Sequence, residues 1–224
     1  MTPREPPLST ADLFADAPTE SRSEPLVPGA VVLRAFAMPN VTQIFAALQT
    51  ITDAAPFRHM VTPGGFEMSV AMMNCGAYGW VSDRSGYRYT ADDPASGRPW
   101  PNLPAVFEQL AVDAAAAAGF GEFTPDACLV NRYAAGSRLS LHQDRNERDF
   151  AAPIVSVSLG LPAVFLFGGA RRADRPRRVP LWHGDVVVWG GPARLHYHGV
   201  LPLAAGEHLI SGAYRFNLTL RKAV

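Results

Sequence analysis

Cysteine is scarce in this sequence. Cys75 and Cys128 are the only two in 224 residues, and no CxxC pair occurs. This usage excludes a disulfide framework and is typical of a protein kept in a reducing compartment, where both thiols are expected to be buried packing residues.

The chain also lacks an excess of charge of one sign and any long hydrophobic run. Twenty Lys and Arg residues balance twenty Asp and Glu residues, so the protein does not bind nucleic acid through bulk charge, although a local basic patch can still contact phosphates. No apolar run approaches the roughly 20 residues that cross a bilayer, and no signal-peptide pattern opens the sequence. We therefore expect a cytoplasmic protein with no membrane partner and, by default, a monomer without an obligate protein partner.

What the chain does contain is enough apolar sequence for one folded domain. Residues 1–26 are rich in Pro, Ser, Thr and acidic residues, and we expect them to form a flexible tail. Apolar residues then recur at helical spacing over 41–54, with Asn40 as a candidate N-cap, and again over 106–119, where Gly119 is placed to end the helix.

From Ala127 onward the pattern changes to short apolar runs rich in β-branched and aromatic residues, such as IVSVSLGL, AVFLFGG, DVVVWGG and YRFNLTLR. These runs predict strands, and the lack of helical patterns between them predicts antiparallel connections. The expected fold is therefore mostly β with supporting α: two sheets in a sandwich or jelly roll, flanked by two helices.

The stretch LHQDRN places His142 and Asp144 two residues apart. In an extended chain such residues lie on one face, so both can bind one metal ion. A third ligand is available from His196 or His198 in LHYHG, and the spacing alone leaves the choice open. Two histidines and one carboxylate with open positions suit non-haem Fe(II), while a carboxylate that merely orients a surface histidine is the simpler alternative.

The final strand alternates between an apolar face and a polar face that carries Arg215, Asn217, Thr219 and Arg221. Two arginines in a cavity require a compensating anion, and 2-oxoglutarate has a carboxylate at each end. The arginines lie about 20 Å apart along a straight strand, so a common ligand requires that their side chains converge. A solvated strand face with paired charges is the equally simple alternative.

Together these motifs resemble the AlkB family of Fe(II)- and 2-oxoglutarate-dependent dioxygenases, which repair alkylated nucleic acid. The resemblance covers almost the whole chain and is carried by DLFADA, FRHMVTPGGFEMSVAMMNCG, PDACLVNRYAAGSRLSLHQD, APIVSVSLGLPAVFLFGG, HGDVVVWGG, HYHGVLPL and YRFNLTLR. It implies a double-stranded β-helix, or jelly roll, over residues 27–224 with a nucleotide-recognition lid at about 61–92.

The resemblance also implies roles for individual residues. The implied iron ligands are His142, Asp144 and His198. The implied 2-oxoglutarate contacts are Asn131, Tyr133, Leu139, Arg215, Asn217 and Arg221, with a carboxylate salt bridge to Arg215 and the partner of Arg221 left open. The implied substrate contacts are Met72, Trp80, Tyr87, Asn146, Ser156 and Arg172.

The implied activity is oxidative demethylation of N-alkylated bases of the 1-methyladenine and 3-methylcytosine type. With Fe(II) as the cofactor, 2-oxoglutarate and O2 would be consumed as cosubstrates, releasing formaldehyde, succinate and CO2. A base inside a duplex cannot reach a buried iron, so the expected substrate is alkylated single-stranded DNA or a flipped base, with duplex DNA and RNA as further candidates. Two alternatives are a 2-oxoglutarate hydroxylase of another substrate and a nucleic-acid-binding module with a structural metal.

Two features bear on the substrate. The segment 170–178, ARRADRPRR, holds five arginines in nine residues, which favours phosphate contacts over an ordinary solvated loop only once the resemblance is considered. At Asn146 the family relative has an aspartate that is credited with reading the exocyclic amine of cationic bases. Because Asn146 carries no charge, we expect relaxed discrimination between cationic and neutral lesions.

Overall fold

The computed structural model describes residues 21–224. Of the predicted tail, residues 1–20 lie outside the described residues. The sheet nevertheless begins at Ser23, four residues before the expected start at Val27. The polar composition conceals this edge strand, which is held by the burial of Leu26 and by an ion pair between Glu24 and Arg34 at 2.6 Å.

Two antiparallel sheets form the sandwich. The large sheet has eight strands, which are, in spatial order, β1 (Ser23–Val27), β2 (Ala30–Leu33), β14 (Val186–Trp189), β11 (Ile154–Gly160), β16 (Arg215–Arg221), β9 (Ala127–Tyr133), β4 (Glu67–Gly76) and β3 (Arg58–Val61). The small sheet consists of β10 (Leu139–His142), β15 (His198–Val200), β12 (Ala163–Phe167) and β13 (Arg177–Leu181). Every pairing within these sheets is antiparallel, which confirms the predicted jelly-roll class.

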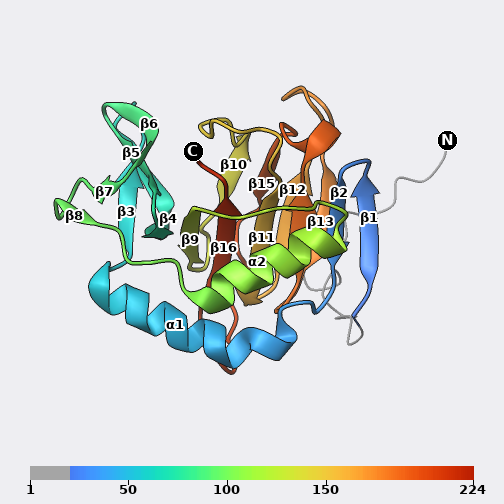
Figure 1. Ribbon diagram of the computed structural model, residues 1–224, viewed down its shortest axis with the longest axis horizontal. Helices are drawn as coiled ribbons and strands as arrows, with labels where there is room; N and C mark the ends of the chain where they lie inside the picture. Colours follow the sequence, from blue (N-terminus) through green and yellow to red (C-terminus); the bar gives the residue numbers. More distant parts are fainter. Residues whose placement is uncertain (1–20) are drawn as a thin grey trace.

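The two predicted helices are present as α1 (Val41–Ala54) and α2 (Ala105–Ala117). Figure 1 shows them side by side across one face of the large sheet. Gly119, with φ of +84°, takes the left-handed conformation that terminates α2. Asn40 does not cap α1 with its side chain, because a 3-10 turn over Met38–Asn40 runs directly into the helix.

Side-chain alternation along the strands divides the apolar core into two layers. One layer packs between the helices and the large sheet and includes Leu218 and Leu220 of β16. The other packs between the two sheets and includes Tyr133 and Trp189. The polar face of β16 therefore points toward the space between the sheets, where it is buried rather than solvated.

Two further hairpins complete the fold: β5 (Gly79–Asp83) with β6 (Gly86–Thr90), and β7 (Asp92–Asp93) with β8 (Arg98–Pro99). The hairpin β5–β6 extends beyond the sandwich in Figure 1. The segment expected to form the lid, 61–92, also contains β4, whose residues 70–76 are buried in the large sheet. The exposed residues of that segment lie mainly in the turn at 63–67 and around the tip of the β5–β6 hairpin, at 84, 85 and 87.

Candidate metal and cosubstrate site

His142, Asp144 and His198 form a compact group of potential metal ligands. Strands β10 and β15 pair so that His142 lies opposite His198, and potential ligand atoms of the three residues all lie within 4.8 Å of one another. The Nε2 atoms of both histidines are 3.7 Å from the Asp144 carboxylate. Gly199 permits this close pairing, because a Cβ there would lie 2.7 Å from the backbone oxygen of Leu139.

Backbone carbonyls orient both histidines. Nδ1 of His142 lies 2.8 Å from the oxygen of Ser140, and Nδ1 of His198 lies 3.0 Å from the oxygen of His196. Each Nδ1 therefore carries the proton and donates it to the carbonyl, which leaves the lone pair of Nε2 facing the site. The side chain of His196 packs against Phe167 instead. The structure thus assigns the third ligand to His198.

The charges of this group suit a divalent cation. Burial alone would raise the pKa of Asp144, but the Arg221 guanidinium and the two histidines outweigh it and hold that pKa well below its ordinary value. Burial lowers the pKa of His198 to about 4. At neutral pH the site therefore offers an ionised carboxylate and a neutral imidazole, which are the protonation states that metal ligands require.

The surroundings of Arg215 indicate a binding site for an anion. Its side chain is buried, with an exposed fraction of 1%, and Nη2 donates to Ser158 Oγ at 3.0 Å. Within residues 21–224, Nε and Nη1 of Arg215 have no hydrogen-bond partner, nor does the buried hydroxyl of Tyr133 nearby. A buried cation with two free donors is costly unless a ligand satisfies them. A carboxylate fits this place.

Asn131 and Asn217 connect this anion site to the interior of the large sheet. Asn217 donates to Ser156 Oγ and to the backbone oxygen of Val157, at 2.8 and 3.0 Å. Its side-chain oxygen accepts from Asn131 at 3.4 Å, while the oxygen of Asn131 has no partner among the described residues. Asn217 therefore holds its neighbours in place, and Asn131 retains a free acceptor.

Arg221 lies at the other end of β16 and contacts the metal group. Its Nε and Nη2 donate to Asp144 Oδ2 at 3.0 and 2.7 Å, and Nε lies 3.4 Å from Glu147. The two arginines of β16 thus have different surroundings: Arg215 has free donors, whereas Arg221 is paired with carboxylates. This answers the question that the sequence left open about the partner of Arg221.

Glu147, Tyr89 and Arg194 were not predicted, although they support the metal ligand. Glu147 is buried and accepts from the Tyr89 hydroxyl at 2.6 Å and from Arg194 at 3.2 Å. Arg194 also donates to the backbone oxygen of Asp144 at 2.8 Å. Burial raises the pKa of Tyr89, so its hydroxyl remains a donor. These contacts join residues from distant segments, and no local spacing signals them.

The β5–β6 hairpin carries the predicted aromatic pair. The rings of Trp80 and Tyr87 stack at 5.6 Å with an interplanar angle of 14°. Asn74 in β4 holds the backbone of Trp80 from both sides, since it donates to the Trp80 oxygen at 2.9 Å and accepts from the Trp80 nitrogen at 3.0 Å. Asn74 was not predicted, because the position of a single polar residue in an apolar strand gives no indication of its partner.

One cavity of about 860 Å³ brings the site together. It is lined by the metal ligands, by all the predicted cosubstrate residues and by the predicted substrate residues Met72, Trp80, Tyr87, Asn146, Ser156 and Arg172. Arg172 enters it from the loop between β12 and β13, with its guanidinium 6.0 Å from the Tyr197 ring. The cavity thus connects the metal group, the anion site and the aromatic hairpin.

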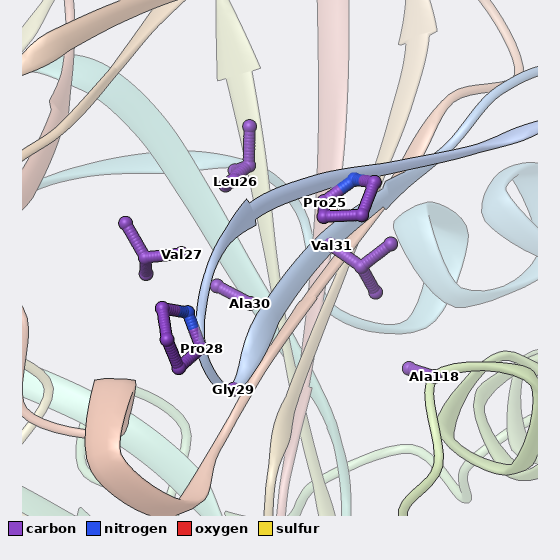
Figure 2. A pocket seen from close by; sticks show the side chains of 8 residues that line it. All are labelled: Pro25, Leu26, Val27, Pro28, Gly29, Ala30, Val31 and Ala118. Carbon is purple, nitrogen blue, oxygen red and sulfur yellow. The ribbon is translucent and has the colours of Figure 1, made fainter.

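A second hollow lies elsewhere, against the turn between β1 and β2 (Figure 2). Its lining is apolar and comprises Pro25, Leu26, Val27, Pro28, Gly29, Ala30, Val31 and Ala118. It contains no titratable side chain and offers no chemistry. No helix in the described part of the chain is long and apolar enough to cross a membrane.

The jelly roll, the facial group of two histidines and one carboxylate, and the buried anion site define a non-haem Fe(II) oxygenase that uses a carboxylate cosubstrate. The sequence model of the 2OG-Fe(II) oxygenase superfamily matches residues 29–221. The chain belongs to this superfamily and, within it, to the AlkB family. It is a dioxygenase dependent on Fe(II) and 2-oxoglutarate, as the resemblance implied.

Two relatives named alpha-ketoglutarate-dependent dioxygenase AlkB match nearly the whole chain. The protein from Salmonella typhimurium is 57% identical over 213 residues, with 95% of this chain and 97% of that protein covered. The protein from Escherichia coli is 56% identical over 212 residues, with the same coverage. The solved structure of OsALKBH1 superposes with a TM-score of 0.80 at 29% identity and covers 90% of this chain and 100% of that one.

The titration of the half-buried His183 and the buried His198 makes the stability of the metal-free protein dependent on pH. Burial lowers the pKa values of His183 and His198 from 6.5 to about 4. Between these values the unfolded chain binds more protons than the folded one, so stability falls as the pH decreases through this window. We expect the melting temperature of the metal-free protein to be lower by at least several degrees at pH 4.5 than at pH 7.

His183→Asn tests this prediction. Nδ1 of His183 accepts from the backbone nitrogen of Gly160 at 2.9 Å, and an asparagine oxygen can accept in its place without titrating. The variant should lose less of its melting temperature over the same pH range. An unchanged pH dependence would refute the contribution of His183.

Proposed function

We propose that the protein reverses alkylation damage in nucleic acid by oxidative demethylation of N-alkylated bases. The observation that carries the proposal is that the metal group and the stacked pair Trp80 and Tyr87 line the same cavity. Aromatic faces bind bases by stacking. The names of the AlkB relatives, and that of the human relative "nucleic acid dioxygenase ALKBH1", 36% identical over 134 residues, support the same class of substrate.

His142, Asp144 and His198 would hold Fe(II), and the free donors of Arg215 and Tyr133 would bind a carboxylate of 2-oxoglutarate, with Asn131 and Asn217 beside them and Leu139 packed against the carbon chain. Arg221 keeps Asp144 ionised and in position. Bound Fe(II) supplies oxygen activation: 2-oxoglutarate and O2 yield succinate and CO2, and one oxygen atom is inserted into a C–H bond of the N-methyl group. The hydroxymethyl product then releases formaldehyde and the restored base.

The protein positions the base. An alkylated base must leave a duplex, or come from a single strand, to enter the cavity. In the proposal Trp80 stacks on the base, His142 lies on its other side, and Met72 and Ser156 contact its rim. We infer a preference for alkylated single-stranded DNA, with duplex DNA and RNA as further substrates. We also infer a monomer without an obligate protein partner, located in the cytoplasm. Its dioxygenase domain would begin with β1 rather than at residue 27, and its lid would comprise the parts of 61–92 outside the buried residues 70–76 of β4.

A coupled assay tests the function. The protein is incubated with Fe(II), ascorbate, 2-oxoglutarate and a single-stranded oligonucleotide that contains one 1-methyladenine, and formaldehyde, succinate and base restoration are measured. Formaldehyde in equal amount to restored base supports repair. Succinate without base restoration, for any alkylated base, favours a hydroxylase of another substrate. Oligonucleotide binding without succinate favours a binding module.

The arginine-rich segment 170–178, between β12 and β13, gives a second prediction. Arg172 is exposed and lines the cavity, and we expect it to contact a phosphate of the bound strand. Arg172→Ala should weaken binding of a methylated single-stranded oligonucleotide and reduce the slope of log K against log salt by about 0.7. Its affinity for 2-oxoglutarate should stay unchanged.

Arg171→Ala is the matched control for charge. Arg171 lies in the same loop, but its guanidinium pairs with Asp174 at 3.1 Å. Removing it deletes the same formal charge, and we expect a smaller change in the salt slope. Equal slopes for the Arg172 variant and the unmodified protein would refute the phosphate contact.

A further inference from the structure

The side chain of Asn146 is held in one orientation by Trp80. Its Oδ1 lies 3.2 Å from the indole Nε1. An indole N–H is only a donor, so the atom that faces it must be the carbonyl oxygen of Asn146 and not the amide nitrogen. The chemistry of the partner therefore fixes an orientation that would otherwise be ambiguous, because the two ends of an amide have similar shapes.

The fixed amide leaves two donors for a ligand. Asn146 is exposed and lines the central cavity. Nothing else in the described chain forms a hydrogen bond with its Nδ2. A base that stacks on the indole face lies parallel to the ring, so the rim of that base passes beside the edge where Asn146 is bound. Because the oxygen of Asn146 faces the indole, the group of Asn146 that meets this rim is its NH2 group, which is a hydrogen-bond donor.

The charges around the cavity agree with this polarity. Two carboxylates line it, Glu67 and Asp144, and Asp144 is paired with Arg221. Five arginines line it as well: Arg138, Arg145, Arg172, Arg215 and Arg221. Position 146 adds no negative charge. A cationic base thus gains little electrostatic attraction from the side chains of this cavity. A neutral base does not depend on such attraction.

We propose that Asn146, oriented by Trp80, selects damaged bases that carry a carbonyl oxygen, in place of the exocyclic amine of adenine or cytosine, beside the methylated nitrogen. N1-methylguanine and N3-methylthymine are the bases of this class. Both are neutral, and their carbonyl oxygens accept from the Asn146 amide. In 1-methyladenine and 3-methylcytosine an exocyclic amine occupies that place, and two donors then face each other without an acceptor. The proposal rests on the proposed function and specifies its substrate class.

Two variants test the proposal from opposite directions. Asn146→Asp replaces the donor by an anionic acceptor. Trp80→Phe keeps an aromatic face but removes the indole N–H, so that the amide of Asn146 is free to turn its oxygen toward the base. In both variants the preference for carbonyl-bearing bases should decrease.

The measurement uses two single-stranded oligonucleotides that differ only in one base, N1-methylguanine or 1-methyladenine. The ratio of their kcat/KM values for formaldehyde release is compared with the ratio of their binding constants, obtained by fluorescence anisotropy with Mn(II) and 2-oxoglutarate. Asn146→Asp should lower both ratios at least about tenfold. Gln143→Glu adds a similar charge to the cavity lining, but Gln143 contacts the backbone of Leu195 and not the indole, so this control should change the ratios much less.

The possible outcomes separate this proposal from the proposed function. Demethylation of both bases with ratios that fall in Asn146→Asp and in Trp80→Phe supports the role of Asn146. Demethylation with ratios unchanged in both variants overturns that role and leaves the repair function intact. Ratios that fall equally in Gln143→Glu overturn it too, because general charge would then explain the effect. Absence of formaldehyde from every methylated base overturns the repair function itself.

Discussion

In the His198→Ala variant, binding of Mn(II) as a redox-inert substitute for Fe(II) is expected to fall by more than about 100-fold, and succinate formation should cease. The reason is geometric: Nε2 of His198 faces Asp144 at 3.7 Å and is one of three potential ligand atoms in the group. Loss of residues that merely orient a ligand already costs about 10–100-fold in affinity. Titration calorimetry with Mn(II) measures the effect directly.

His196→Ala is the matched control, since the two histidines are separated by one residue. The side chain of His196 packs on Phe167, and its contribution to the site is the backbone oxygen that orients His198. The variant keeps that oxygen, so we expect near-normal Mn(II) affinity. Loss of metal binding in His196→Ala with retention in His198→Ala would contradict the assignment of the third ligand.

The Arg215→Met variant is expected to have two effects of opposite sign. Its affinity for 2-oxoglutarate should fall by a factor of about 10²–10⁴, because two hydrogen bonds to a charged group each contribute about 1.5–3 kcal/mol. Without cosubstrate, its free energy of unfolding should be equal or higher, because the substitution removes a buried charge with two unsatisfied donors. Calorimetry with Mn(II) and urea denaturation measure the two quantities.

Arg221→Met supplies the contrast on the same strand. Arg221 pairs with Asp144 and lies near Glu147, both buried, so its removal leaves carboxylates without a full set of partners. We expect it to lower the free energy of unfolding by about 3–5 kcal/mol. If Arg215→Met bound 2-oxoglutarate as tightly as the unmodified protein, the anion site would have to lie elsewhere in the cavity.

Local patterns predicted the features that depend on short spacing. The two-residue period placed His142 with Asp144 and separated the two faces of β16, and helical spacing gave α1 with its observed bounds. The choice of His198 as the third ligand could not be made from local spacing, because the spacing of LHYHG allows either histidine. The register of β10 against β15 resolves it, and that register depends on contacts between segments more than fifty residues apart.

Other features had no local signal. The strand Ser23–Val27 is hidden by polar composition, since it is an edge strand held by pairing and by one ion pair with Arg34. The pairing of Arg221 with Asp144 joins residues 77 positions apart. The hydrogen bond from Trp80 to Asn146 spans 66 positions, and it changes the interpretation of Asn146 from a missing charge to an oriented donor.

The shared carboxylate of Glu147 has a consequence for protein engineering. Its partners come from three separate segments: Tyr89 from the β5–β6 hairpin, Arg194 from the loop before β15, and Arg221 from β16. A hairpin transplanted from a relative must therefore bring a hydroxyl donor to the position of Tyr89, or the graft leaves a buried acid short of one donor. Chimeras that exchange this hairpin should be designed with position 147 included in the exchanged unit.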